Sequence, residues 1–341
     1  MKGVSYQAGR EPNIGDEIHH TVADIMRADI SLTREYENVT STKTAWAPAL
    51  CLLAALCLSK PVVAQEIEPF EFVPLPAGTN LILGYYVFGH GSEFHSDTTS
   101  SPLGSRSGST TKNSNIDVNI AIARYVHYFD VGGMPAGVQI LQPFGNISAS
   151  FGGQSLGGQF GAGGTTLSAF IWPYVNTASK TNILLAGFLV PPDGTYHRSQ
   201  IINVGDNRFR GTVEAGISQA LGDSFAFDAA FDVQFYGDNA NGFPGNTRIS
   251  QDPTYRLQLW GTYRISPTIT TSLGYEGFFG GVQTSNGFLN GNATKIQRIR
   301  ANAAIFLTPR LQTMVEINHD LSVTGGYKQD IGVTGRILYV F

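Results

Sequence analysis

The last eleven residues of the chain alternate between two faces, and this restricts the possible folds more than any other feature. Successive side chains of a strand point to opposite sides of the sheet. One face here carries Arg336, and the other is apolar or aromatic, with Ile331, Val333, Gly335, Ile337, Tyr339 and Phe341. Two structures fit this pattern: the closing strand of a membrane barrel, or an edge strand of a soluble sandwich.

The same alternation recurs in segments of roughly ten residues from Thr79 onward, as in a membrane barrel. It is clearest over 224–237, where phenylalanines at every second position have Asp228 and Asp232 between them. An amphipathic helix cannot have this spacing, because its apolar residues recur every three or four positions. The pattern predicts strands at 79–88, 115–129, 137–148, 165–176, 181–190, 207–219, 224–237, 253–266, 268–279, 294–307, 311–323 and 329–341.

The connections between these strands are by turns short and long. Short ones lie at 132–136, 176–180, 222–223, 266–267 and 308–310, and long ones at 89–114, 149–164, 191–206, 238–252 and 280–293. In an up-and-down barrel with both ends in the periplasm, the short turns are periplasmic and the long loops lie outside. The polar strand positions hold Arg, Asp, Gln and Thr, whereas a water-facing sheet tends to be richer in Lys and Glu.

We therefore predict an all-β fold, an antiparallel up-and-down transmembrane β-barrel of about 12 strands, formed by residues 79–341 in the bacterial outer membrane. The charged fraction of 14% and the 40 glycines are typical of such a barrel. In this barrel, Ile337, Tyr339 and Phe341 resemble the signal read by the outer-membrane assembly machinery. That machinery and outer-membrane lipids are the expected partners during biogenesis and in the membrane.

Residues 1–64 have the features of a leader. Lys43 precedes a mostly apolar stretch at 45–58, and small residues ending at Ala64 mark a cleavage site, so 39–64 is predicted to be a signal peptide cut after Ala64. Residues 1–38 are polar and acidic; they are interpreted as a mis-assigned start or as part of an unusually long leader. The segment 65–78 that follows is expected to be periplasmic or to plug the lumen.

The composition after the leader excludes several functions. Both cysteines, Cys51 and Cys57, lie in the leader, so disulfides, thiolate zinc sites and cysteine nucleophiles are excluded. The remaining chain has 16 Lys and Arg against 19 Asp and Glu, which excludes a strongly basic surface for nucleic acid. The histidines are scattered and form no metal-binding pattern, and no cofactor is expected.

The middle of the chain contains three motifs in a fixed order. They read FGAGGTTLSAFIWPYVN from residue 160, TNILLAGFLVPPDGTY from residue 181 and NVGDNRFRGTVEAGISQALG from residue 203. Together with PLPAGTNLILGYYVF at 74–88, this order resembles the family called "Putative MetA-pathway of phenol degradation", over essentially all of 70–341. The resemblance implies a porin-like, transporter-type barrel and, more weakly, uptake of aromatic or other hydrophobic molecules in connection with aromatic degradation. It implies no catalytic step.

Charged residues of both signs occupy strand positions that are predicted to face inward. These candidates for a selectivity path are Arg208, Arg210, Glu214, Asp228, Asp232, Arg256, Arg264, Glu276, Arg298, Arg300, Glu316 and Arg336, with Asp117 and Asp320 on the same predicted face. Inward charges are costly unless paired or hydrated, so we expect ion pairs across the strands. The alternative is structural filling of the barrel. Arg298 and Arg300 are the preferred selectivity residues, because two cations project inward from one strand.

The motif residues between 190 and 210 have the composition of turns. Pro192, Gly194 and Tyr196 belong to the first cluster, and Asn203, Gly205, Asn207 and Arg208 to the second. They are expected to shape an outer loop, the alternative being direct contact with a ligand.

We expect an outer-membrane channel or transporter for passive uptake of small hydrophobic or aromatic compounds, without enzymatic activity. One alternative is an outer-membrane lipid hydrolase, since His197 and Ser199 have the H-x-S spacing of such enzymes, although no third orienting group is evident. The other alternative is a structural or adhesive barrel without a conducting path.

Overall fold

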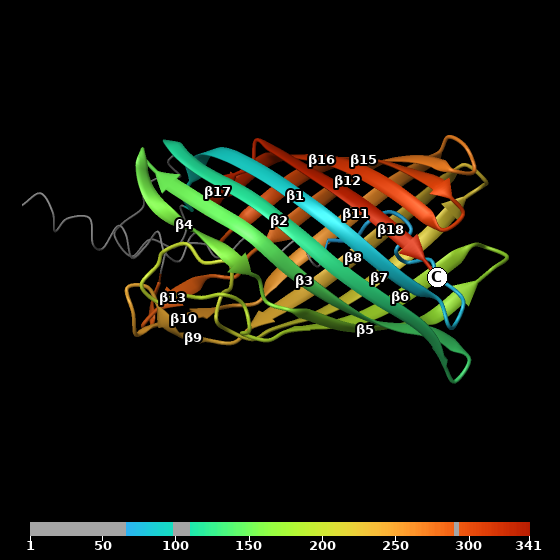
Figure 1. Ribbon diagram of the computed structural model, residues 1–341, viewed down its shortest axis with the longest axis horizontal. Helices are drawn as coiled ribbons and strands as arrows, with labels where there is room; N and C mark the ends of the chain where they lie inside the picture. Colours follow the sequence, from blue (N-terminus) through green and yellow to red (C-terminus); the bar gives the residue numbers. More distant parts are fainter. Residues whose placement is uncertain (1–65, 98–109, 290–292) are drawn as a thin grey trace, which may run out of the picture. The chain divides into compact units, whose positions relative to one another are not determined.

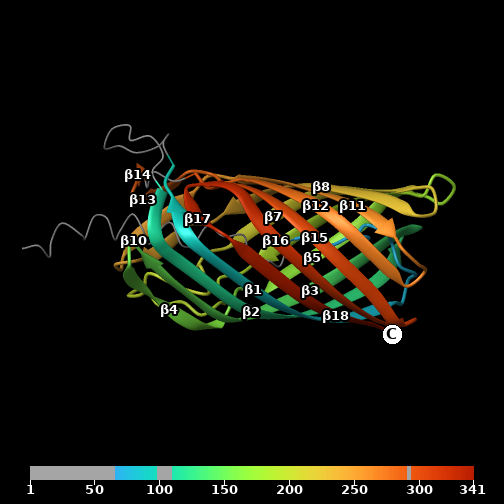
Figure 2. The same cartoon turned by 90° about the horizontal axis from the view of Figure 1, so that it is seen from above.

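Twelve long strands form a closed antiparallel barrel in the computed structural model, which describes residues 66–97, 110–289 and 293–341 (Figures 1 and 2). They are β1 (Asn80–His95), β2 (Thr110–Val131), β3 (Met134–Phe151), β5 (Thr166–Asn176), β6 (Thr181–Val190), β7 (Arg210–Leu221), β8 (Phe225–Tyr236), β11 (Thr254–Arg264), β12 (Ile269–Phe279), β15 (Lys295–Thr308), β16 (Leu311–Thr324) and β18 (Ile331–Val340). Strand β1 closes the barrel, because it pairs with β2 on one side and with β18 on the other, from Leu81 opposite Val340 to His90 opposite Ile331.

All twelve predicted strands are present, so the predicted fold class is confirmed. The predicted long loops are wrong in part, because several contain strands. β1 and β2 extend into 89–114, and β4 (Gln154–Ala162) lies within 149–164 and pairs with β3. A further short strand, β17 (Gly326–Lys328), lies outside the predicted long loops and pairs with β1. A small sheet is made of β9 (Asn239–Gly242), β10 (Thr247–Gln251), β13 (Gln283–Ser285) and β14 (Phe288–Leu289). These strands depend on pairing with their neighbours, which a local residue pattern does not reveal.

The additional strands gather at one end of the barrel. Figures 1 and 2 show β4, β10 and β13 at the end opposite the C-terminus. The C-terminal end carries the short turns, which face the periplasm in outer-membrane barrels. The barrel thus carries additional strands at the end opposite the C-terminus, and only short turns at the C-terminal end.

The outer surface of the barrel is apolar. Leu273 is 67% exposed and Val213 62%, and the alternate phenylalanines of β8 are exposed as well. Ile337 and Tyr339 of β18 face outward, as does Phe341 directly after the strand, and the rings of Tyr339 and Phe341 stack with centroids 6.2 Å apart. Among the described residues, no helix is long and apolar enough to cross a membrane.

The inner surface has two different walls. On β7 to β16 it is polar, with charged residues at alternate positions, as the sequence predicts. On β1 to β3 it is apolar: Val87, Ile120, Ile122 and Leu141 are buried there as one cluster. Because Ile120 and Ile122 of β2 face inward, Asp117, an odd number of positions away, faces outward, and its predicted inward position is wrong. Asp117 lies opposite His90, whose Nδ1 is 2.7 Å from its Oδ1.

Candidate ligand path through the barrel

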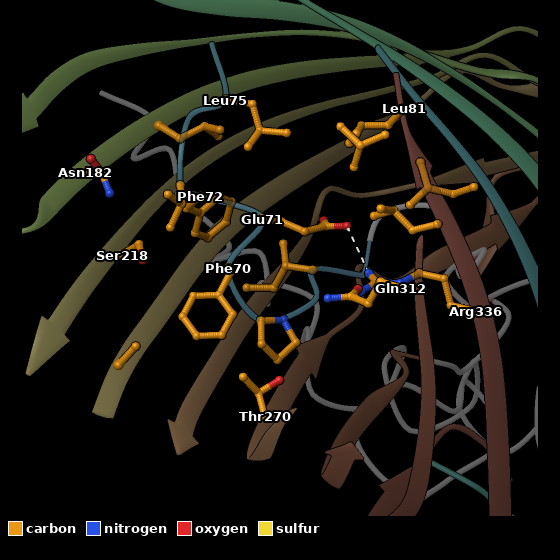
Figure 3. Close-up of a pocket in the computed structure, with 18 of the residues that line it drawn as sticks. Phe70, Glu71, Phe72, Leu75, Leu81, Asn182, Ser218, Thr270, Gln312 and Arg336 are labelled. Atoms are coloured by element: carbon orange, nitrogen blue, oxygen red, sulfur yellow. Dashed lines mark hydrogen bonds and ion pairs between the residues drawn. The ribbon is translucent and has the colours of Figure 1, made fainter. Parts of the chain in front are cut away.

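Residues 66–72 lie inside the barrel and contact inward-facing side chains from several strands (Figure 3). Residues 76–78 are exposed. Trp260 on β11 donates from Nε1 to the carbonyl of Ile67, and Trp172 on β5 donates to the carbonyl of Phe72. The main-chain N–H of Ile67 donates in turn to Gln258 at 3.0 Å. Hydrogen bonds to the main chain fix the position of the segment without depending on its side chains. The predicted leader and its cleavage site at Ala64 lie outside the described residues.

The three acidic residues of this segment meet arginines of the barrel wall. Glu66 lies 3.5 Å from Arg298 and 3.4 Å from Arg300, and Glu71 lies 2.7 Å from Arg124. Glu68 is 3.7 Å from Arg300 and accepts a hydrogen bond from Asn302. Burial and the nearby Glu316 together raise the pKa of Glu68 to about 8, and the attraction of Arg300 does not offset them.

The wall arginines are also paired with carboxylates of neighbouring strands. Arg256 lies 2.7 Å from Asp232, and Arg298 lies 2.7 Å from Asp320. Arg300 donates two hydrogen bonds of 2.9 Å to Glu316. The predicted pair Arg298 and Arg300 is therefore surrounded by acidic groups and does not present two free cations to the lumen.

Most of the predicted lumen residues are buried where the sequence places them. Buried in the lumen are Arg208, Arg210, Glu214, Asp228, Asp232, Arg256, Glu276, Arg298, Arg300, Glu316 and Arg336, whereas Arg264 is exposed at the short-turn end. Arg208 and Arg210 lie at the opposite end of the barrel, 3.4 Å and 3.2 Å from their shared partner Asp206. The guanidinium of Arg208 stacks on the ring of Tyr236, 4.5 Å from its centroid. The inward charges thus form at least two groups: one around Asp206 near the end opposite the C-terminus, and one around Arg298 and Arg300.

The loop between β6 and β7 folds against the apolar wall, so the motif residues meet protein groups on several sides. Asn203 is buried, accepts a hydrogen bond from the N–H of His197 and donates to the carbonyl of Gln200. A Cβ atom at Gly205 would come within 2.7 Å to 3.0 Å of the backbone of Gly194. Val204 packs on the cluster of Val87, Ile120, Ile122 and Leu141. These contacts favour a structural role for the motif.

The remaining motif residues connect this loop to its neighbours. Tyr196 donates to the carbonyl of Asn241 and accepts a hydrogen bond from Asn239, and Asn207 donates to Asn239 at 2.9 Å. Asn207 has a φ of 53°, a left-handed conformation that asparagine tolerates. Pro192 is exposed at the turn.

His197 and Ser199, the candidate hydrolase residues, are both exposed in this loop. Within the described ranges we find no hydrogen bond between their side chains. A catalytic serine needs a base held within hydrogen-bonding distance, and the base needs an orienting group. The observed arrangement provides neither of these contacts.

A cavity of about 580 Å³ separates the N-terminal segment from the short-turn end of the barrel. Figure 3 shows Phe70, Phe72 and Leu75 of the segment around it, together with Leu81 of β1. Further apolar side chains come from the ends of the strands: Leu83, Leu184, Phe188, Phe306, Leu338 and Val340. The periplasmic half of the lumen is therefore apolar around much of its circumference.

Sequence reasoning missed the groups that hold the segment in place. The sequence pattern does not distinguish Trp172 and Trp260 from other strand residues, and Arg124 is not among the predicted lumen residues. The signal that could have found them is chemical complementarity: the segment carries Glu66, Glu68 and Glu71, and inward positions of β2 and β15 carry arginines.

A closed antiparallel barrel with an apolar outer surface and charged side chains in its lumen is the architecture of an outer-membrane channel. The family model described as "Putative MetA-pathway of phenol degradation" matches residues 99–330, more than half of the chain, and the chain belongs to this family. No curated protein matches the sequence.

The chain is also similar to solved structures. The COG4313 outer membrane channel from Pseudomonas putida F1 is 25% identical with a TM-score of 0.75, and the match covers 81% of this chain and 100% of that chain. The β-domain of the Bordetella autotransporter BrkA is 10% identical, with a TM-score of 0.46 over 78% of this chain and 100% of that chain. A mutant of the TodX monoaromatic hydrocarbon channel is 11% identical, with a TM-score of 0.41 over 78% and 90%. At these TM-scores the last two carry no argument about function.

Proposed function

We propose that the protein is a passive channel for small hydrophobic or aromatic compounds, and that residues 66–78 act as a plug in its lumen. The observation that carries the proposal is the apolar inner wall of β1 to β3. The lumen of a general porin is polar and water-filled, so apolar residues facing inward are unfavourable there. Val204 of the loop between β6 and β7 already packs on part of this wall. A solute that is itself apolar covers the wall further in place of water.

The apolar wall supports a path along one side of the lumen. Phe94 and Ile116 form a second buried cluster toward the mouth, beyond the cluster that contains Ile122 and Leu141. The cavity below the N-terminal segment continues the apolar lining toward the periplasm. A hydrophobic solute would meet apolar surface at the mouth, in the middle and at the exit.

The plug role is supported by the hydrogen bonds and ion pairs that hold residues 66–72 across the lumen. In this position the segment restricts the free passage of water and ions. Movement of the segment, or of its side chains, would then accompany passage of a solute. The family description supports a link to aromatic compounds, and its connection to a degradation pathway gives the reason why a cell would import them.

A substitution in the apolar wall tests the proposed path. Replacing Ile122 by Asp places a charge on the wall and should lower uptake of naphthalene by cells that express the protein, at unchanged expression. The matched variant Val131→Asp places the same charge at the exposed end of β2 and should leave uptake unchanged. Equal uptake by cells that express wild-type protein and the Ile122→Asp variant would contradict the proposed path.

A further inference from the structure

Glu214 differs from the other acidic residues of the central lumen. Its side chain is buried, with 3% of the residue exposed, and its Oε2 has no hydrogen-bond partner among the described residues. Most of the others have arginine partners, for example Asp232 with Arg256. Asp228 has no arginine partner in the described part of the chain either, and it accepts a hydrogen bond from the main-chain N–H of Phe70. Buried polar atoms almost always have a partner, and each exception needs an explanation such as a missing water or ligand.

Glu214 also lines the apolar cavity below the N-terminal segment. It lies opposite Ala186 of β6 and Asp232 of β8, so neither of its direct neighbours in the sheet donates a hydrogen bond from a side chain. Next to it on the inner face of β7, a Cβ at Gly216 would come within 2.4 Å of the ring of Phe72. One acceptor thus faces a cavity whose other surfaces are largely apolar.

We propose that this cavity binds an apolar molecule that carries one hydrogen-bond donor, a hydroxyl or amine group, and that the carboxyl of Glu214 accepts its hydrogen bond. The inference rests on the proposed function and narrows its substrate class. The volume of about 580 Å³ is within the range of small-molecule sites, so the apolar part of a bicyclic or larger molecule fits against the leucines and phenylalanines. The site lies on the periplasmic side of the segment and holds the solute before release.

The charges around the cavity argue against an acidic ligand. Three arginines of the described ranges line the cavity, and each donates to a protein group. Arg124 donates to Glu71 at 2.7 Å, and Arg336 donates to Gln312 at 2.7 Å. Arg264, at the short-turn end, donates to the carbonyl of Asp223 at 3.3 Å. At its open end, Lys180 lies 3.1 Å from Asp223, and both side chains are exposed. An anionic group next to Glu214 would be repelled by it and by Asp232.

Four naphthalene derivatives test whether the cavity prefers a ligand with a hydrogen-bond donor. Binding of naphthol, naphthylmethylamine, methoxynaphthalene and naphthoic acid is measured by equilibrium dialysis on the full mature chain in lipid nanodiscs. Empty nanodiscs correct for partition into lipid. In wild-type protein, naphthol should bind about tenfold tighter than methoxynaphthalene, which lacks a donor. Equal affinity of these two compounds, or tighter binding of naphthoic acid, would overturn the proposal.

Variants at Glu214 test whether this residue causes the preference for naphthol over methoxynaphthalene. Glu214→Leu should bring the ratio of naphthol to methoxynaphthalene affinity to about one, because the acceptor is lost. Glu214→Gln keeps an acceptor without the charge, so it should retain most of the preference for naphthol and lose any preference for the amine. Glu93→Gln, a change at a residue that does not line the cavity, should match wild type.

The outcomes are distinct from those that test the channel itself. An unchanged naphthol preference in both Glu214 variants would overturn the role of Glu214. If cells still took up naphthalene through the protein in that case, the proposed function would stand and this inference alone would fail. If the Glu214→Leu variant does not fold, as judged by heat-dependent migration on a gel, the Glu214→Gln variant still decides the amine preference.

Discussion

The indole Nε1 of Trp260 donates a hydrogen bond of 3.0 Å to the main-chain carbonyl of Ile67, which lies 193 residues earlier in the chain. Trp172 makes the corresponding bond to the carbonyl of Phe72 at 2.8 Å. The chain has three tryptophans, and the third, Trp46, lies in the predicted leader. Both tryptophans of the barrel therefore contact the N-terminal segment, and their fluorescence reports its position.

Deletion of residues 66–76 should shift tryptophan emission to longer wavelengths and raise the single-channel conductance of the protein in planar bilayers. The shift follows because both indoles lose apolar surroundings and a hydrogen-bond acceptor. Asp238→Asn, at a residue between β8 and β9, serves as the control and should change neither measurement. Unchanged conductance after the deletion would contradict the role of the segment as a plug.

Conductance should also rise with pH through the titration of Glu68. Its pKa in the docked segment is raised from 4.5 to about 8 by burial and by Glu316, against the opposing pull of Arg300 and Arg336, while Glu71 adds to the rise. While the segment lies in the lumen, Glu68 holds a proton that it gives up when the segment is released. Binding of the segment in the lumen therefore weakens as pH rises from about 4.5 to about 8. Conductance measured across this range should increase, and Glu68→Gln should flatten the curve. An equally steep curve in that variant would assign the pH dependence to another group.

Removal of the charge at Arg300 should destabilise the barrel strongly. Arg300→Met leaves the buried Glu316 without its partner, and breaking a buried pair in this way costs about 3–5 kcal/mol. Arg248 pairs with Asp238, but its side chain is 70% exposed, and Arg248→Met should cost less than about 1 kcal/mol. Urea unfolding in lipid vesicles gives both free energies of unfolding. Similar values for the two variants would contradict the central importance of the lumen pairs.

Substitution at Gly205 should loosen the loop between β6 and β7. The Cβ of alanine at this position would lie 2.7 Å to 3.0 Å from backbone atoms of Gly194, which cannot move aside as a side chain does. We expect faster cleavage of 191–206 in limited proteolysis of Gly205→Ala. The control is Gly187→Ala, since an added Cβ there meets no atom within 4 Å. A cleavage rate equal to that of wild type would indicate that the loop tolerates the added atom.

The sequence was sufficient for the barrel strands because alternation is a local property of each strand. It failed at Asp117, where the rule that apolar residues face the lipid reverses: Ile120 and Ile122 face inward on the same strand. Local patterns also miss β4, a glycine-rich segment that becomes a strand by pairing with β3. The partners of Arg300 depend on strand register and on a segment 233 residues away, and neither can be read from the neighbouring sequence.

Uptake of a hydrophobic solute by intact cells tests the central claim most directly. The measurement compares initial uptake of radiolabelled naphthalene and of a small sugar by cells with and without the protein, in a host that lacks its own copy. We predict that the protein accelerates naphthalene uptake and leaves sugar uptake almost unchanged, because one wall of the lumen is apolar and the N-terminal segment blocks its centre. Acceleration of sugar uptake without an effect on naphthalene would contradict this prediction.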